Sequence, residues 1–170
     1  GRVWEWGASV GGDLWRTTGD ITDTWSSLSR IGFGQADLFA HAGPGAWNDP
    51  DMLVVGTVGW GPKLRPSRLS PNEQVTHVTL WAVLAAPMLL GSDMARLDPL
   101  TLDLLTNEEV LAVNLDPLGK QGRRVKADES GREVWVRELE DGTRAVALFN
   151  RGAEASRVEV RFADLGLTGP

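Results

Sequence analysis

The sequence predicts an α/β fold, with a parallel sheet or barrel covered by helices, followed by the start of an antiparallel β-sandwich. Up to about Gly119, short apolar runs alternate with segments of helical periodicity, the order expected of a parallel sheet. After Gly119 the apolar residues alternate at period two, as in antiparallel strands. We therefore predict a partial barrel-like domain over residues 1–120 and a partial antiparallel domain over residues 121–170, with the boundary near 119–124.

The first predicted elements are two strands with a helix between them. The segment Arg2–Trp6 (RVWEW) is rich in Val and Trp and ends at a glycine, which is typical of a strand. After Asp20, apolar residues recur at helical spacing, and Thr22 is placed to cap that helix. The segment Asp51–Gly56 (DMLVVG) is a continuous apolar run after a polar turn, as buried parallel strands are.

A second helix is predicted to begin at Ser70, because Pro71 and Glu73 follow this serine in the order of a capping box. The residues after it are apolar on nearly every face, so we expect this helix to be buried. The segment before it, residues 56–70, predicts a surface loop, and Pro87–Gly91 (PMLLG) predicts another short buried strand. Two further helices are expected after the N-cap residues Asp98 and Asn107.

The antiparallel domain opens with a hairpin. Its strands, Glu133–Leu139 and Thr143–Asn150, alternate at period two and are joined by the turn signal Glu140-Asp141-Gly142. The segment Arg157–Phe162 alternates again and predicts a third strand. Three strands do not complete a β-sandwich, and a predicted strand follows Gly1 almost directly. We therefore expect the sequence to be part of a longer protein.

Composition excludes several classes of function. The chain has 170 residues, a net charge of −6 and a pI near 4.9, which argue against nucleic-acid binding because that needs a basic face. The absence of cysteine excludes disulfides and thiol catalysis, and no apolar run approaches the ~20 residues of a membrane span. We expect His77, Trp81 and Trp135 to lie in the core and expect no metal site. The compartment is left open between extracellular and cytoplasmic in a bacterium.

Carboxylates follow the predicted strands and lie near tryptophans. Glu5 lies in the first strand, Asp20 follows LWRTTG, and Asp49 and Asp51 lie in GAWNDPDML. Residues at the C-terminal ends of parallel strands converge on one site, and paired carboxylates beside tryptophan fit glycoside hydrolysis. The same residues also fit structural roles, since Asp commonly closes turns. Arg16, four positions before Asp20, fits an ordinary surface ion pair.

Four longer stretches occur in an informative order: WRTTGDI, AGPGAWNDPDMLVVG, LWAVLAAPMLLGSD and NEEVLAVNLDPLGKQG. They closely resemble the second half of glycoside hydrolase family 27, the α-galactosidase/melibiase family, and the resemblance runs from about Trp4 to the last β-segment. It implies the C-terminal half of a (β/α)8 TIM barrel, about strands five to eight, followed by the start of an antiparallel β-sandwich. It also implies a retaining mechanism through a covalent glycosyl-enzyme.

The resemblance assigns roles to individual residues. Asp20 matches the general acid/base, and Arg16 matches the arginine that contacts the sugar hydroxyls. An Arg16–Asp20 ion pair would favour the ionised carboxylate and oppose the acid role, so we expect the guanidinium to point at the substrate. Asp51 matches a sugar-contacting aspartate after the seventh strand, and Met52 beside it lines the pocket. Two neighbouring residues, Asn48 and Asp49, are expected to hold the turn together.

The resemblance also implies limits. Trp6 lies in EWG, which resembles the plant-type strand-five motif whose tryptophan borders the sugar's 2-position; Trp4 stands where that pattern has cysteine. A tryptophan wall leaves little room for an N-acetyl group and favours galactose. The family nucleophile is an aspartate in a Lys-x-Asp motif after the fourth strand. We expect no such motif in this chain, and we expect the nucleophile upstream of it.

We therefore predict a glycosidase that releases terminal α-linked D-galactose from oligosaccharides or glycoconjugates with retention. Two carboxylates suffice for this reaction, so no cofactor is implied. The expected partner is an α-galactoside, with no nucleic acid or membrane, and the oligomeric state is left open. The alternatives are α-N-acetylgalactosaminidase, β-L-arabinopyranosidase or isomaltodextranase activity, or a non-catalytic sugar-binding fragment. We expect the isolated chain to be inactive, because half a barrel exposes two sheet edges and lacks the nucleophile.

Overall fold

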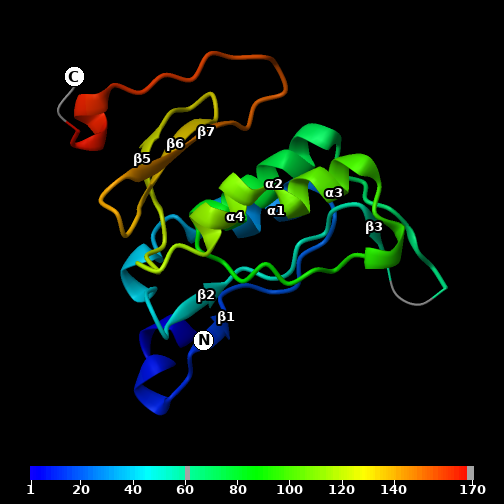
Figure 1. The fold of residues 1–170 in the computed structure, drawn as a ribbon, viewed down its shortest axis with the longest axis horizontal. Helices are drawn as coiled ribbons and strands as arrows, with labels where there is room; N and C mark the ends of the chain where they lie inside the picture. Colours follow the sequence, from blue (N-terminus) through cyan, green and yellow to red (C-terminus); the bar gives the residue numbers. More distant parts are fainter. Residues whose placement is uncertain (60–61, 168–170) are drawn as a thin grey trace.

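Helices lie between two sets of extended segments in this computed structural model, which describes residues 1–59 and 62–167 (Figure 1). Short parallel segments lie below the helices in the figure, and an antiparallel sheet lies above them. The described residues form the α-helices α1 (Trp25–Gly32), α2 (Pro71–Val83), α3 (Pro99–Thr106) and α4 (Glu108–Asn114). The strands are β1 (Leu14–Arg16), β2 (Trp47–Asp49), β3 (Thr57–Val58), β4 (Arg65–Pro66), β5 (Arg123–Ala127), β6 (Arg132–Glu138) and β7 (Arg144–Asn150).

Three stretches of chain run side by side below the helices (Figure 1). Strand β1 pairs in parallel with β2, and the chain after β2 makes one parallel bridge between Leu53 and Leu90. The strands predicted over 51–56 and 87–91 are therefore wrong in extent, since each contributes only this bridge. Pro50 cannot donate to a ladder, and Asp51 has a φ of 97°, so the chain turns where a continuous strand was expected.

The predicted strand at Arg2–Trp6 is also wrong, because residues Val3–Glu5 form a 3-10 helix, η1. Strand-forming residues need a neighbouring strand, and β propensity mainly reflects how side chains pack in a sheet. Arg2 and Glu5 instead form an ion pair of 3.0 Å across the turn, which suits helical spacing.

Most helix starts agree with the sequence. The Ser70 side chain accepts from the Glu73 N–H and the Glu73 side chain accepts from the Ser70 N–H, so the capping box of α2 is confirmed. The predicted caps of α3 and α4 are confirmed as well, each accepting a backbone N–H three residues on. The cap of α1 is wrong by two positions, because Thr24 accepts from Ser27 N–H. Thr22 instead places its hydroxyl 3.2 Å from that of Thr24.

The antiparallel sheet has the order β5-β6-β7. The predicted hairpin is confirmed as β6 and β7, paired in register from Arg132–Asn150 to Glu138–Arg144. The strand predicted at Arg157–Phe162 is wrong, because β5 takes the edge of the sheet instead. Residues 157–161 lack strand pairing, yet Val158 and Val160 pack with the small apolar cluster on the sheet. The alternation of apolar and polar residues in this segment therefore arises because one side of it packs on the sheet, although the segment does not pair as a strand.

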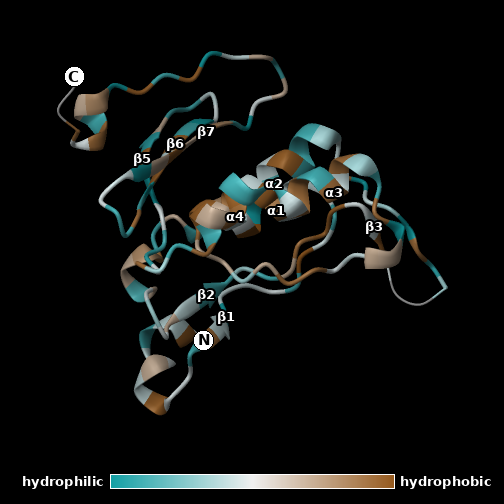
Figure 2. Ribbon diagram, in the orientation of Figure 1, coloured by the Kyte–Doolittle hydropathy of each residue, from teal (hydrophilic) through white to brown (hydrophobic). Residues whose placement is uncertain are grey.

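One apolar core joins the helices, the segments below them and part of the sheet. Figure 2 shows hydrophobic residues on the helices and on the extended segments beneath them. The rings of Phe33 and Phe149 meet edge to face at 5.2 Å, and Trp135 approaches Phe33 at 6.2 Å. His77, Trp81 and Trp135 are fully buried, as predicted. No helix of the described residues is long and apolar enough to cross a membrane.

The buried His77 predicts acid sensitivity. Burial lowers its pKa from 6.5 to about 3, and the neutral ring accepts from the Val54 N–H at 3.2 Å. The folded state thus stays unprotonated where the unfolded chain binds a proton, so stability present above pH 6.5 is lost as pH falls toward 3. Between pH 6.5 and 5 the loss is about 2 kcal/mol.

Urea denaturation at pH 5, 6.5 and 8 checks this loss of stability. His77→Gln, which keeps an acceptor for the Val54 N–H, is expected to flatten the dependence between pH 6.5 and 5. The partly exposed His41 provides the control, and His41→Gln is expected to leave the dependence as in the parent protein. An unchanged slope in His77→Gln would show that other groups cause the acid sensitivity.

Candidate active site

The parallel strands β1 and β2 bring two loops together. Arg16 ends β1 opposite Asp49, the last residue of β2. Beyond the strands, Thr17 donates its N–H to the Asp49 carbonyl at 2.9 Å, and the Thr18 hydroxyl donates to the Pro50 carbonyl at 3.1 Å. The segment that carries Asp20 is therefore tied to the turn that follows β2.

Buried polar side chains support this turn, as predicted. The Asp49 carboxylate accepts from the Asp51 N–H at 2.8 Å, and burial raises its pKa. Asn48 accepts from the Trp15 indole at 2.9 Å and donates to the Gln121 side chain at 2.9 Å. Asn48 and Asp49 thus hold the turn in place, and both are buried.

Arg16 lies between two carboxylates. Its Nη2 is 2.8 Å from Asp51 Oδ2 and 3.3 Å from Asp20 Oδ1. The guanidinium was expected to point at the substrate without clamping Asp20. It instead pairs mainly with Asp51 and more weakly with Asp20. The physical reason is burial: the Asp51 side chain is only 10% exposed and needs a cation, whereas the Asp20 side chain is 96% exposed.

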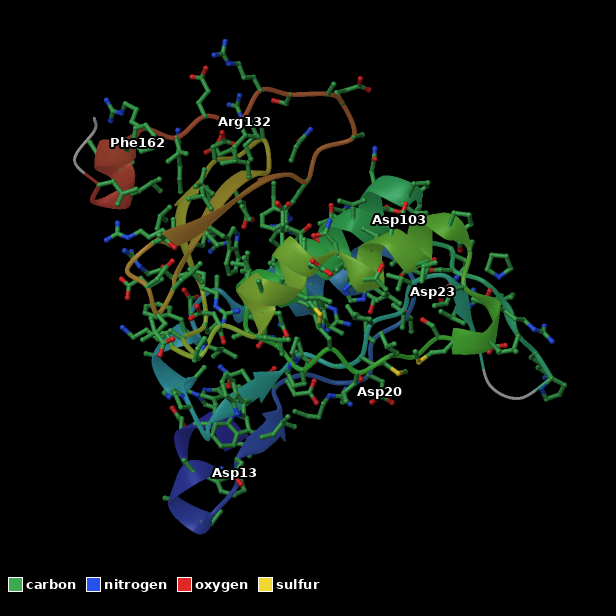
Figure 3. All side chains as sticks on the ribbon, in the orientation of Figure 1. Asp13, Asp20, Asp23, Asp103, Arg132 and Phe162 are labelled. Carbon is green, nitrogen blue, oxygen red and sulfur yellow. The ribbon has the colours of Figure 1, made fainter. Side chains whose placement is uncertain are left out.

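The Asp51 carboxylate has little free acceptor capacity. Its Oδ2 also accepts from the Ile21 N–H at 2.8 Å, and its Oδ1 accepts from the Met52 N–H at 2.7 Å. A carboxylate oxygen accepts about two hydrogen bonds, so Oδ1 retains one position for a hydroxyl group. Among the described residues, the Asp20 side chain makes only the long contact to Arg16, and it lies on the side of the extended segments that faces away from the helices (Figure 3).

A cleft of 580 Å³ lies beside this cluster. Met52 lines it, together with Thr22 and Asp23, which follow the acid/base candidate. Arg16, Asp20 and Asp51 adjoin the cleft without being among its lining residues. The place of Met52 in the wall of a sugar pocket therefore stays a prediction.

Asp23 holds together several residues that line the cleft. Its buried carboxylate forms a bidentate ion pair with the Arg65 guanidinium. It also accepts a hydrogen bond from the Arg68 guanidinium at 2.8 Å. These contacts hold the pKa of Asp23 well below its usual range. Within residues 56–70, predicted as a surface loop, the described strands β3 and β4 pair with each other, and their register places Val58 opposite Arg65.

Trp4 and Trp6 are not brought to this cluster by any hydrogen bond in the described residues. Trp4 lies in η1, and Trp6 follows it with 53% of its surface exposed. Gly7 lies directly against the Trp15 ring in β1. Along the chain, both tryptophans precede β1, whereas Asp20 follows it.

The expectation that no Lys-x-Asp triplet occurs is wrong, because the chain holds one, Lys126–Asp128, in the antiparallel part. Asp128 accepts from Ser130 and Arg132, and these bonds lower its pKa to about 2. It closes the turn between β5 and β6 through the Ser130 and Arg132 backbone N–H groups. In residues 1–59 and 62–167, no group of three or more His, Asp or Glu side chains could hold a metal ion.

Two residues that support the site were not predicted as such. Asp23 is one, and Trp81 is the other, since its indole donates to the Asp51 carbonyl at 2.7 Å. The signal for Trp81 was its place in an apolar helix, because a buried indole N–H needs an acceptor.

Comparison with known proteins decides the family. The profile of alpha galactosidase A matches residues 9–116, and the profile of the alpha galactosidase C-terminal beta sandwich domain matches residues 129–170. The chain belongs to glycoside hydrolase family 27. The family predicted from the four sequence motifs, the α-galactosidase/melibiase family, is therefore confirmed.

Family relatives differ in activity. Alpha-galactosidase 2 of Arabidopsis thaliana is 42% identical over 96% of this chain and 40% of its own length. Alpha-N-acetylgalactosaminidase of Mus musculus is 39% identical over 82% of this chain and 32% of its own. The crystal structure of a β-L-arabinopyranosidase from Geobacillus stearothermophilus aligns with a TM-score of 0.82 at 36% identity, over 91% of this chain and 36% of that one. The chain thus spans about 40% or less of the relatives it matches.

Proposed function

We propose that this chain supplies the acid/base and part of the sugar pocket of a retaining glycosidase that releases terminal α-linked D-galactose. The observation that carries the proposal is the exposed Asp20 carboxylate, 3.3 Å from Arg16, beyond the ends of two parallel strands in a chain of family 27. Asp20 is free to exchange a proton with a ligand, and Arg16 and Asp51 offer a donor and an acceptor to sugar hydroxyls.

The chemistry runs in two steps. A nucleophilic carboxylate outside this chain attacks the anomeric carbon, the bond to the leaving oxygen breaks, and Asp20 gives its proton to that oxygen. The Asp20 carboxylate then takes a proton from water as the water oxygen attacks the anomeric carbon and displaces the nucleophile. Two inversions give retention.

The fold of the complete domain is also a proposal, based on the family match and on the strand pairing. We infer that β1, β2 and the segments bridged at Leu53 and Leu90 belong to the C-terminal half of a (β/α)8 barrel, with α1 and α2 on its outside. The boundaries at 1–120 and 121–170 are part of this proposal. The parallel pairing of β1 with β2 and the profile match to residues 129–170 support it.

Substrate choice within the family is tested by three aryl glycosides: the α-galactoside, the α-N-acetylgalactosaminide and the β-L-arabinopyranoside. For the full-length protein that contains these residues, we expect kcat/KM for the α-galactoside to exceed that for the others by about tenfold or more. Proton NMR of the first product is expected to show α-galactose. Preference for another glycoside would overturn the galactose assignment, and binding without hydrolysis would favour a sugar-binding protein.

The isolated 170-residue chain is expected to show no hydrolysis of the aryl α-galactoside above buffer, because it holds Asp20 without a partner carboxylate. Coexpression with a segment that carries the Lys-x-Asp strand is the matched positive arm, and it is expected to restore activity. Turnover by the chain alone, retained after removal of contaminating enzymes, would show that the second carboxylate lies within it.

A further inference from the structure

Asp51 adopts a backbone conformation that non-glycine residues rarely take. Its φ is 97°, in the left-handed region where L side chains are strained, and such strain persists only when surrounding contacts fix it. Two contacts hold the peptide units on either side: the Asp51 N–H donates to Asp49 Oδ1 at 2.8 Å, and the Asp51 carbonyl accepts from the Trp81 indole at 2.7 Å. The direction of the Asp51 side chain depends on both.

Trp81 is itself fixed. It lies in α2, is fully buried, and meets the His77 ring edge to face at 4.2 Å. Gly32 of α1 has no side chain at the contact, and a Cβ there would lie 2.8 Å from the Trp81 ring. The indole N–H therefore has a single defined direction, toward Asp51.

The Asp51 carboxylate, held in this direction, binds the segment that carries Asp20. Its Oδ2 binds Arg16 Nη2 and the Ile21 N–H, each at 2.8 Å. These two partners stand on either side of Asp20 in the chain, while the Asp20 side chain makes only the 3.3 Å contact to Arg16. Among the described residues, the Asp20 side chain has no hydrogen-bond partner other than Arg16, so its position is set by the neighbours that Asp51 holds.

We propose that Trp81 is a positioning residue for the acid/base: through Asp51 it holds Arg16 and Ile21, and so aims the Asp20 carboxyl group at the leaving oxygen. This inference rests on the proposed function, because it assumes that Asp20 is the acid/base. It adds a role in catalysis for a core residue of α2 that lies outside the sugar pocket.

The test compares two substrates in the full-length protein. A dinitrophenyl α-galactoside has a leaving group that departs without a proton, whereas an alkyl α-galactoside requires one. Trp81→Phe removes the N–H donor, and we expect kcat/KM for the alkyl substrate to fall about 10- to 100-fold, as for misplaced catalytic groups. The loss for the dinitrophenyl substrate should be at least tenfold smaller. The ratio of the two values does not depend on how much of the variant is folded.

Trp135→Phe is the matched control. Trp135 is also fully buried and donates its N–H to Glu133 at 2.8 Å, away from Asp51. The Trp135→Phe variant is expected to lose stability and to keep the parental ratio of kcat/KM for the alkyl and dinitrophenyl substrates. Replacing Trp81 with benzothienylalanine, which exchanges the N–H for sulfur and keeps the ring shape, covers the case in which Trp81→Phe does not fold. It is expected to reproduce the change in ratio.

Asp20→Ala separates this inference from the proposed function. If Asp20→Ala leaves the ratio unchanged, Asp20 is not the acid/base and the proposed function fails. If Asp20→Ala changes the ratio while neither Trp81 variant does, the positioning role alone is overturned. In the Asp20→Ala background, Trp81→Phe is expected to have no further effect on the ratio, because the group that it aims is gone.

Discussion

Replacing Asp20 by alanine is expected to lower kcat/KM of the full-length protein for an alkyl α-galactoside by about 10²- to 10⁴-fold, the usual contribution of a positioned proton donor. The protein should fold as before. The Asp20 side chain is 96% exposed and has only the long contact to Arg16, and exposed ion pairs contribute about 0–1 kcal/mol to stability. The loss of activity would therefore report chemistry rather than folding.

Azide distinguishes loss of the acid/base from loss of binding. With the dinitrophenyl substrate the glycosyl-enzyme still forms, but water attacks it slowly without a base. Azide needs no base, so its nitrogen displaces the enzyme carboxylate and gives α-galactosyl azide. We expect added azide to raise kcat of Asp20→Ala and to leave the parent enzyme unchanged. Undiminished hydrolysis of the alkyl substrate by the variant would contradict the role of Asp20.

Asp23→Asn is the contrasting variant three residues along. Asp23 is 5% exposed and binds two guanidinium groups, so its loss removes the contacts that hold the β3–β4 hairpin. We expect a lower free energy of unfolding and no rescue by azide, with the thermal midpoint and the azide response as the two measurements. Neighbouring aspartates would thus separate into one that acts on substrate and one that acts on structure.

What could be predicted from the sequence was governed by contacts near in the chain. The capping box Ser70–Glu73 spans three residues and the hairpin between β6 and β7 turns at 140–142, so both were predicted. Arg2–Trp6 and Arg157–Phe162 failed because a strand needs a partner, and pairing is decided by distant residues. Strand-like composition indicated which side chains pack against the core. It did not indicate which backbone segments hydrogen-bond to each other.

The site divides in the same way. Motif resemblance located Asp20, Arg16 and Asp51 without geometry. The pairing of Arg16 with Asp51, and the contact between Trp81 and Asp51, join residues 35 and 30 positions apart. No local pattern signals a positive φ at an aspartate, since that conformation is imposed by its surroundings. Motif resemblance therefore suggests roles for these residues, which stay predictions, while the contacts that join them come from the structure alone.

The second large effect is expected at Arg137, which joins the antiparallel sheet to the helices. Arg137 lies in β6 and is fully buried. Its Nη1 donates to the Ala82 carbonyl at 2.7 Å, and both terminal nitrogens are 3.3 Å from the Asn114 carbonyl. These carbonyls lie at the C-terminal ends of α2 and α4, where unpaired C=O groups and the helix dipoles favour a cation. Burial lowers the pKa of Arg137, and the nearby Asp116 opposes that shift.

Arg137→Met is expected to reduce the free energy of unfolding by about 3–5 kcal/mol, because it removes the charge-assisted hydrogen bonds to two helix ends. Among the described residues, the Asn114 carbonyl is left without a donor, and the Ala82 carbonyl keeps only the Ala85 N–H. For a protein of this size that corresponds to a drop in thermal midpoint of roughly 10 °C. Arg123 on the neighbouring strand β5 is exposed, and Arg123→Met should change the midpoint by less than about 2 °C. Equal midpoints for the two variants would show that water or a rearranged backbone satisfies the carbonyls, and that the guanidinium does not hold the sheet to the helices.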